Sequence, residues 1–328
     1  MKLKFTFKVN MTSQQIPLHS GFGPSTTALE VLEGVDLSGQ TAVVTGGHSR
    51  LGLETTRALV ASGARVIVAA RNVDQAALAL AGLQNVEVAS LDLADLASVR
   101  SFASDFLATG RHIDMLIASA GIMATPELRV GPGWEAHFAI NHLGHFALTN
   151  LLWPTLRGGA RVVSVSSLGH HASAIRWDDP QFLHGYDKWL AYAQSKTANA
   201  LFAVHLDRLG RDSDVRAFSL HPGKIFTPLQ RHLTQQEMID VGWMNAEGKG
   251  IDPTFKTPEQ GAATQVWAAT SAQLAGSGGV YCEDCDVAVL ERAESPSSSG
   301  VRFHAIDPEQ AEKLWSMSAR VTGINAFE

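Results

Sequence analysis

The residues best suited to chemistry are Tyr192 and Lys196, which lie four positions apart in Tyr192-Ala193-Gln194-Ser195-Lys196. On a helix, residues four apart share one face, so the phenol and the ammonium can point into one pocket. A phenol has an ordinary pKa of about 10, and a nearby cation lowers it by favouring the phenolate. This pairing predicts that Tyr192 is a general acid and base. Two residues on a solvated helix face, without any catalytic role, would have the same spacing. The rest of the chain must therefore decide between these two interpretations.

A glycine-rich turn follows a predicted strand at residues 41–45. It reads Gly46-Gly47-His48-Ser49-Arg50-Leu51-Gly52 and leads into a predicted helix that ends near residue 62, before a strand at 64–70. Glycine lets the backbone approach a pyrophosphate, and a helix N-terminus offers free N–H groups. The unit predicts dinucleotide binding, with a plain strand-to-helix turn as the alternative. Arg50 stands at the middle glycine position, where it points outward, crowds the cofactor or contacts a phosphate.

The end of the second strand indicates which dinucleotide fits. NAD sites commonly place an acid there for the ribose 2′-hydroxyl, whereas an arginine accommodates a 2′-phosphate. Here Ala69-Ala70 is followed by Arg71-Asn72, and the first acid is Asp74. Arg71 therefore favours NADP(H) over NAD(H), and Arg50 is a second candidate cation. A solvated strand-end charge is the alternative.

The elements that must position these residues alternate along the chain. Further strands are predicted at 85–90, 113–118, 161–165 and 215–220, and helices at 95–109, 132–156 and from Tyr192 to about residue 209. This order predicts an α/β protein with a doubly wound parallel sheet (a Rossmann fold), in which ligands bind at the carboxyl ends of the strands. We expect one domain at 39–328. Residues 1–38 are expected to form an N-terminal arm, with a short helix near 27–33, that lies across the domain or is partly disordered.

Composition excludes several classes of protein. The chain has 328 residues, 45% of them hydrophobic and 18% charged, as in soluble globular enzymes. Its net charge of −6 argues against nucleic-acid binding, and it has no apolar run near the roughly 20 residues of a membrane span. We expect a cytoplasmic protein, because there is no signal peptide and there are only two cysteines.

The cysteines and histidines do not indicate a metal site. Cys282 and Cys285 follow a predicted late strand and lack the second ligand pair of a zinc site, so we expect ordinary buried or edge thiols. The thirteen histidines include no His-Glu-x-x-His sequence. We therefore expect no bound metal.

Taken together, the motifs resemble those of the short-chain dehydrogenase/reductase family. The most similar branch includes the retinol dehydrogenases, WW-domain-containing oxidoreductase and light-dependent protochlorophyllide reductase, and the resemblance spans about 40–320. It is carried by Thr45-Gly-Gly-His-Ser-Arg-Leu-Gly52, Asp92-Leu93, Ala118-Ser-Ala-Gly121, Asn141-His-Leu-Gly-His-Phe146, Val165-Ser-Ser167, Tyr192-Ala-Gln-Ser-Lys196, His221-Pro-Gly223 and Asp307-Pro-Glu…Lys313-Leu-Trp-Ser316. Two positions depart from the family pattern: glycine is usual at Arg50, and asparagine is usual at Ser119, where its amide braces the central strand.

The resemblance implies a catalytic tetrad. Tyr192 would be the general acid in reduction and the base in oxidation, and Lys196 would lower its pKa and hold the nicotinamide ribose. Ser167 would bind the substrate oxygen, with Ser166 as the weaker candidate. Asn141 would hold a water that links Lys196 to solvent.

The resemblance also implies the cofactor contacts and the substrate wall. The cofactor residues would be Gly46, His48, Ser49, Arg50, Leu51, Gly52, Arg71, Asp92, Leu93, Ala120, Gly121, Tyr192, Lys196, Pro222, Gly223, Ile225 and Thr227. The long segment 168–190 would form part of the substrate wall. Residues 228–257 carry apolar side chains between glycines, which predicts a mobile lid over a hydrophobic alcohol, ketone or aldehyde; a helix pair packed on the sheet is the alternative.

Three functions remain to be weighed. The leading one is an NADP(H)-dependent carbonyl reductase or alcohol dehydrogenase. A non-enzymatic NADP-sensing regulator on the same fold is the second, although such proteins usually lose the tyrosine or the lysine. A nucleotide-sugar epimerase or dehydratase is the third, and it would need a longer C-terminal domain and an acid that favours NAD. A homo-oligomer assembled through the two long helices, as in many family members, is a further expectation.

Overall fold

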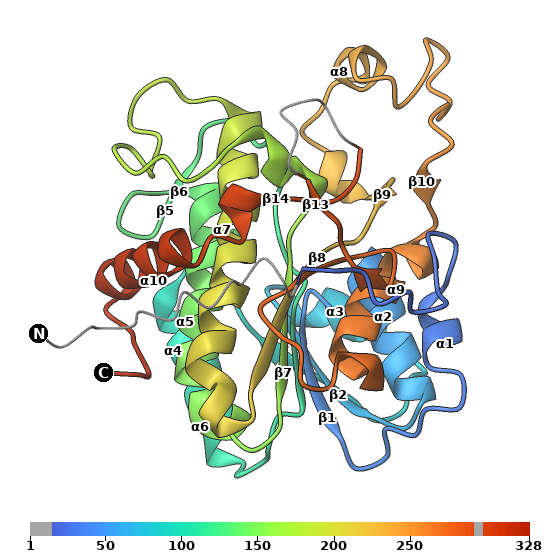
Figure 1. Cartoon of the computed structure of the whole chain (residues 1–328), viewed down its shortest axis with the longest axis vertical. Helices are drawn as coiled ribbons and strands as arrows, with labels where there is room; N and C mark the ends of the chain where they lie inside the picture. The colour runs from blue at the N-terminus through green and yellow to red at the C-terminus, as the bar shows by residue number, and fades with distance from the viewer. Residues whose placement is uncertain (1–14, 292–297) are drawn as a thin grey trace, which may run out of the picture.

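The computed structural model describes residues 15–291 and 298–328, with a twisted sheet at its centre and helices on both faces (Figure 1). Within these residues the sheet has eight strands in the order β12-β11-β8-β7-β4-β1-β2-β3. The strands from β11 to β3 are parallel, and β12 pairs with β11 in the antiparallel sense. Their bounds are β1 (Thr41–Thr45), β2 (Arg65–Ala70), β3 (Val86–Ser90), β4 (Met115–Ala118), β7 (Arg161–Val165), β8 (Arg216–His221), β11 (Tyr281–Glu283) and β12 (Asp286–Val287).

Both faces of the sheet are buried, which explains why strands such as β1 are apolar without alternation. Ala42 and Val44 face one core, shared with α1, α2 and α9, whereas Val43 faces the other, shared with α4, α5 and α7. The helices are α1 (Ala28–Val31), α2 (Arg50–Ala61), α3 (Val73–Ala79), α4 (Leu96–Ala108), α5 (Gly144–Leu151), α6 (Trp153–Leu156), α7 (Lys188–Gly210), α8 (Gln235–Asp240), α9 (Pro258–Thr270) and α10 (Pro308–Thr322). The predicted α/β fold with a doubly wound parallel sheet is confirmed.

Residues 15–38, the described part of the predicted arm, lie against the domain. The side chain of Gln15 pairs with the edge of β11: it donates to Tyr281 O at 2.8 Å and accepts from Tyr281 N at 2.9 Å. The expected short helix is α1, and Thr27 and Glu30 form a capping box at its start. The rest of the arm, residues 1–14, lies outside the described residues.

The prediction of one long helix over 132–156 was wrong. A tight hairpin of β5 (Arg129–Val130) and β6 (Trp134–Glu135) occupies the start of that range, and Gly131 and Gly133 have positive φ in its turn. A π-helix at Phe138–Leu143 follows and continues into α5. Glu135 starts it, because its carboxylate accepts the N–H groups of His137 and Phe138 at 3.0 and 2.8 Å.

The predicted lid segment is an excursion between two short strands. β9 (Lys224–Ile225) and β10 (Phe255–Lys256) pair in parallel, so both ends of the excursion lie side by side at its base. The excursion carries α8 and lies at the top of Figure 1, past the ends of the sheet strands. A third short pair, of β13 (Leu290–Glu291) with β14 (Val301–Arg302), lies in the C-terminal part of the chain. None of the described helices combines the length and the apolar character that a membrane crossing requires.

Candidate active site

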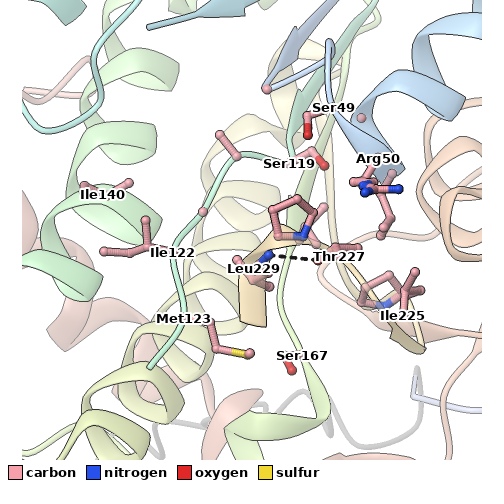
Figure 2. Close-up of a pocket in the computed structure, with 18 of the residues that line it drawn as sticks. Ser49, Arg50, Ser119, Ile122, Met123, Ile140, Ser167, Ile225, Thr227 and Leu229 are labelled. Atoms are coloured by element: carbon pink, nitrogen blue, oxygen red, sulfur yellow. Dashed lines mark hydrogen bonds between the residues drawn. The ribbon is translucent and has the colours of Figure 1, made fainter. Parts of the chain in front are cut away.

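A cavity of about 640 Å³ opens at the carboxyl end of the sheet. Residues that follow β1, β2, β3, β4, β7 and β8 line it, as expected for ligands of a doubly wound sheet. Every site residue named from the sequence lines this cavity except Asn141, which lies behind its wall. Figure 2 shows Ser49 and Arg50 at the start of α2, with Ile122 and Met123 across the cavity from them.

The glycine-rich turn is shaped for a close approach of backbone. A Cβ atom on Gly52 would lie 2.3 Å from Gly46 O, so only glycine fits there. Ser49 precedes α2 without a side-chain cap, which leaves the first N–H groups of the helix directed at the cavity. Arg50 also lines the cavity, with a φ of +45°.

A second observation also indicates that a phosphate-bearing cofactor fits this turn. The buried Nδ1 atom of His48 has no hydrogen-bond partner among the described residues. A buried polar atom without a partner costs free energy, so a group that completes its hydrogen bond would stabilise the site. His48 lines the cavity beside Ser49. The turn therefore has both the space and an unmet hydrogen bond for a ligand.

The adenosine side of the cavity carries Arg71 and Asp92. Arg71 follows β2 directly and is exposed at the cavity rim. Asn72, next to it, caps α3 by accepting the N–H of Gln75 at 3.0 Å. Asp92 is held by its own turn, in which its carboxylate accepts the N–H of Ala94 at 2.9 Å. Arg71 is thus an exposed cation at the end of β2, in the place where the sequence predicted it.

Tyr192 and Lys196 enter the cavity from α7. Asp187 starts this helix by accepting the N–H groups of Trp189 and Leu190, both at 2.8 Å. The side chains of Tyr192 and Lys196 share the predicted face, and Lys196 Nζ lies 5.6 Å from the centre of the Tyr192 ring. Lys196 Nζ also donates to Val165 O at 3.0 Å, which holds it against the end of β7.

The pKa of Tyr192 is shifted in the direction opposite to the one expected from its spacing to Lys196. Burial raises the pKa of Tyr192 to about 12, while a hydrogen bond with the Ser167 side chain acts in the opposite direction. Burial also lowers the pKa of Lys196 to about 8. Both charged forms are disfavoured because both groups are removed from water. The phenol is therefore held in its protonated form at neutral pH.

The two serines after β7 face different ways. Ser166 is buried and donates to Lys196 O at 2.7 Å, which ties β7 to α7. Ser167 lines the cavity, where its side chain acts to lower the pKa of Tyr192, and its backbone carbonyl accepts a hydrogen bond from His170 Nδ1 at 2.7 Å. Gly169 keeps this loop close to Tyr192, because a Cβ there would lie 3.0 Å from the ring. The geometry thus favours Ser167 over Ser166 as the serine that meets a substrate.

Asn141 supports the cavity wall from the π-helix. Its side chain accepts the N–H of Ile122 at 2.8 Å and donates to Ile122 O at 3.0 Å and to Ser195 Oγ at 2.9 Å. It therefore joins the loop after β4 to α7. Its backbone carbonyl accepts a hydrogen bond from the ring of His145 at 3.0 Å.

An apolar cluster includes Tyr192. It joins the lid segment to the loop after β4 and to α7 and consists of Met123, Ala124, Trp189, Tyr192, Leu229, Leu233, Met238 and Trp243. The lid residues thus pack around Tyr192 and not on the sheet. Sequence reasoning missed Ile122 and Met123, although the available signal was their place directly after Gly121. Gly169 was included only as one position of the predicted substrate-wall segment 168–190.

The cysteines and histidines have structural surroundings. Cys282 and Cys285 are free and buried, as predicted, and burial raises the pKa of Cys285 to about 12. Over residues 15–291 and 298–328, no group of three or more histidine, cysteine, aspartate or glutamate side chains is placed to hold a metal ion.

Comparison with known proteins agrees with the fold. The family model for short chain dehydrogenases matches residues 40–238. A protein of Streptomyces lividans named as a probable oxidoreductase is 45% identical over 87% of this chain and 98% of its own length. Retinol dehydrogenase 11 of Mus musculus is 36% identical over 88% of each chain. The crystal structure of an uncharacterised protein from Mycobacterium paratuberculosis superposes with a TM-score of 0.69, at 34% identity, over 89% of this chain and 96% of that one. The chain therefore belongs to the short-chain dehydrogenase/reductase family, as an oxidoreductase of its retinol dehydrogenase-like branch.

Proposed function

We propose that this oxidoreductase transfers a hydride between NADP(H) and a hydrophobic secondary alcohol, ketone or aldehyde, with Tyr192 as the general acid and base. The observation that carries this proposal is that Ser167 and Tyr192 line the same cavity as the glycine-rich turn, with Gly169 keeping the loop after β7 close to the Tyr192 ring. A carbonyl oxygen placed between these two hydroxyls would accept a hydrogen bond from each.

The protonation state of Tyr192 supports reduction at neutral pH. Because burial raises the pKa of Tyr192 to about 12, the phenol carries the proton that a reduced carbonyl oxygen needs. A nicotinamide cofactor, when bound, supplies the hydride. Lys196 would orient the ribose, since it lines the cavity and is anchored on Val165 O. Asn141 would act by fixing the loop after β4 and, as in the family, by holding a relay water.

The cofactor preference follows from charge at the rim. Arg71 and Arg50 line the cavity on its adenosine and phosphate sides. A 2′-phosphate gains charge-assisted hydrogen bonds from such guanidinium groups, whereas a ribose hydroxyl gains much less. We therefore favour NADPH over NADH.

The substrate class follows from the apolar cluster. Trp189, Leu229 and Trp243 line the cavity near Tyr192, and water is a poor competitor for such a surface. The excursion between β9 and β10 would open and close over the substrate as a lid. The two free thiols fit a reducing compartment such as the cytoplasm.

The test is the Tyr192→Phe variant, assayed by NADPH absorbance with a panel of hydrophobic ketones and aldehydes. We expect a loss of at least ~10²-fold in kcat, because the proton donor is removed, with NADPH affinity unchanged by fluorescence titration. Near-normal turnover would rule out the acid–base role. A wild-type chain that binds NADPH but reduces no carbonyl compound would instead favour the regulatory protein.

A further inference from the structure

His145 lies at the junction of three segments that border the cofactor side of the cavity. It belongs to α5 and is 3% exposed. One ring nitrogen, Nε2, lies 2.9 Å from Thr45 Oγ1, and the other, Nδ1, lies 3.0 Å from Asn141 O. Both polar atoms of the ring are therefore used.

These two contacts fix where the ring carries its proton. A backbone carbonyl only accepts hydrogen bonds, so Nδ1–H of His145 donates to Asn141 O. Burial lowers the pKa of His145 to about 4, opposed by the bond to Asn141, so the ring is neutral at physiological pH. Its Nε2 atom is then an acceptor, and the hydroxyl of Thr45 donates to it.

Thr45 passes this constraint on to the turn after β4. Its hydroxyl oxygen accepts the N–H groups of Ser119 and Ala120, both at 3.0 Å. A hydroxyl has one donor and two acceptor sites, so Thr45 is fully satisfied and its rotamer is set. The chain of hydrogen bonds runs from the turn after β4, through Thr45 and His145, to Asn141.

These hydrogen bonds supply the brace that the family pattern assigns to an asparagine at position 119. Ser119 is held here through its backbone N–H and not through an amide side chain. The segments that these hydrogen bonds join all border the cavity: Thr45 precedes the glycine-rich turn, Ala120 and Gly121 line the cavity, and Asn141 holds Ile122.

Resting on the proposed function, we propose that His145 is a positioning residue that fixes the turn after β4 and Asn141 relative to the end of β1, and so sets the rate of hydride transfer. It touches neither the substrate nor Tyr192 in our assignment. Its effect is geometric, since a displacement of about 1 Å in such a site lowers rates by as much as ~10²-fold.

Two substitutions separate the two contacts of the ring. In His145→Asn the amide reaches the position of Nδ1 and keeps a donor for Asn141 O, but it falls short of Thr45. In His145→Gln the amide reaches the position of Nε2 and keeps an acceptor for Thr45. The matched control is His142→Asn, because His142 is buried on the preceding turn and bonds Ser318 Oγ of α10 at 2.7 Å, away from the cavity.

The first readout is hydrogen–deuterium exchange of the peptide containing 117–122, measured by mass spectrometry on the full chain without substrate. We expect the Ser119 and Ala120 amides to exchange at least fivefold faster in His145→Asn than in the wild type. In His145→Gln, which keeps the acceptor for Thr45, exchange should be slower than in His145→Asn. In His142→Asn it should equal that of the wild type. Equal exchange in both His145 variants and the wild type overturns the proposal. If the His145 variants do not fold, Thr45→Val removes the same link, and unchanged exchange in it has the same meaning.

The second readout is the kinetics with NADPH and a hydrophobic ketone. We expect His145→Asn to lower kcat by about 10- to 100-fold while KM for the ketone stays within about twofold, because the substrate wall is untouched. An equal loss of kcat in His142→Asn would reduce the role of His145 to general stability and overturn the proposal. If the wild type reduces no ketone, the proposed function fails, and the exchange measurement still decides the role of His145.

Discussion

Arg50 holds a backbone conformation that favours glycine, at the position where the family usually has one. Its φ of +45° lies in the left-handed region, which costs a non-glycine residue on the order of 1 kcal/mol or more. Such strain at a site that lines the cavity suggests that the side chain is retained for its charge. The nearby His48 has an unmet hydrogen bond of its own, so the turn offers a ligand both a cation and a hydrogen-bonding atom.

The variant Arg50→Gly separates strain from charge. We expect its free energy of unfolding in urea to rise by roughly 0.5–1 kcal/mol, since relief of strain exceeds the added chain entropy of glycine. We also expect NADPH to bind several-fold more weakly, because a cation is lost. Tighter NADPH binding in a fluorescence titration would show that crowding, and not attraction, dominates at this position.

Arg71 is expected to select the cofactor. In Arg71→Asp the new carboxylate can bond a ribose 2′-hydroxyl and repels a 2′-phosphate, so the ratio of kcat/KM for NADPH to that for NADH should fall by at least tenfold. Arg65→Asp is the matched control, because Arg65 is exposed at the other end of β2. An unchanged ratio in Arg71→Asp would mean that another residue reads the phosphate.

At the scale of elements, the sequence predicted the buried strands well and one helix badly. Strands such as β1 and β4 are short apolar runs bounded by turns, and burial on both faces leaves them no other state. The predicted start of the 132–156 helix was wrong because Pro132 is a residue type that often begins a helix. Gly131 and Gly133 instead form a hairpin turn with positive φ, and Glu135 supplies the start signal three residues later.

The site was predictable where motifs follow strand ends, and unpredictable where burial decides. Tyr192 and Lys196 line one cavity as their spacing indicated, and Ser167 joins them there as the family resemblance implied. The pKa of Tyr192 could not be read from the spacing, because its direction depends on how much water reaches the phenol. The brace through His145 was also hidden, since it joins residues 45, 119, 141 and 145 through contacts that only the fold creates.

Strand β11, which lies between β12 and β8, contains a titrating group with a measurable effect on stability. Burial raises the pKa of Glu283 to about 7 from an ordinary value of 4.5. The folded protein therefore binds more protons than the unfolded chain between these values, so this contribution to stability is present below pH 4.5 and is lost as pH rises through 7.

The variant Glu283→Gln tests this sign. The amide oxygen can still accept the N–H of Gly300, which the carboxylate binds at 2.7 Å, but it has no charge to bury. We expect the variant to gain stability relative to the wild type at pH 8 and much less at pH 5, by urea denaturation at both values. A gain that is the same at both pH values would contradict the assigned pKa.

At the scale of the whole molecule, α10 covers the helices through which family members often associate. Trp315 stacks on Phe202 of α7 at 5.8 Å and 3° and meets Phe146 of α5 edge-on at 4.8 Å. His142 bonds Ser318 from the same side. Figure 1 shows α10, in red, lying across α7 and α5. We therefore expect any homo-oligomer of this chain to use another face.

The variant Trp315→Ala tests this arrangement. Loss of the buried indole should lower the free energy of unfolding by about 3–5 kcal/mol, and the uncovered aromatic face should promote self-association. Light scattering over a range of protein concentrations would show it. Trp243→Ala is the control, because Trp243 belongs to the apolar cluster over Tyr192; the same increase in mass in that variant would exclude a specific role for α10.

The parallel pairing of β9 with β10 has a practical consequence for engineering. Phe255 lies opposite Lys224 and Lys256 opposite Ile225, so the chain leaves and rejoins the domain at nearly the same point. Residues between these strands form a cassette whose exchange for that of a relative alters neither the spacing of the junctions nor the register of the main sheet. Chimeras cut at this boundary would exchange the lid segment together with Thr227 while keeping the rest of the cavity, and so would test whether this segment sets the choice of substrate.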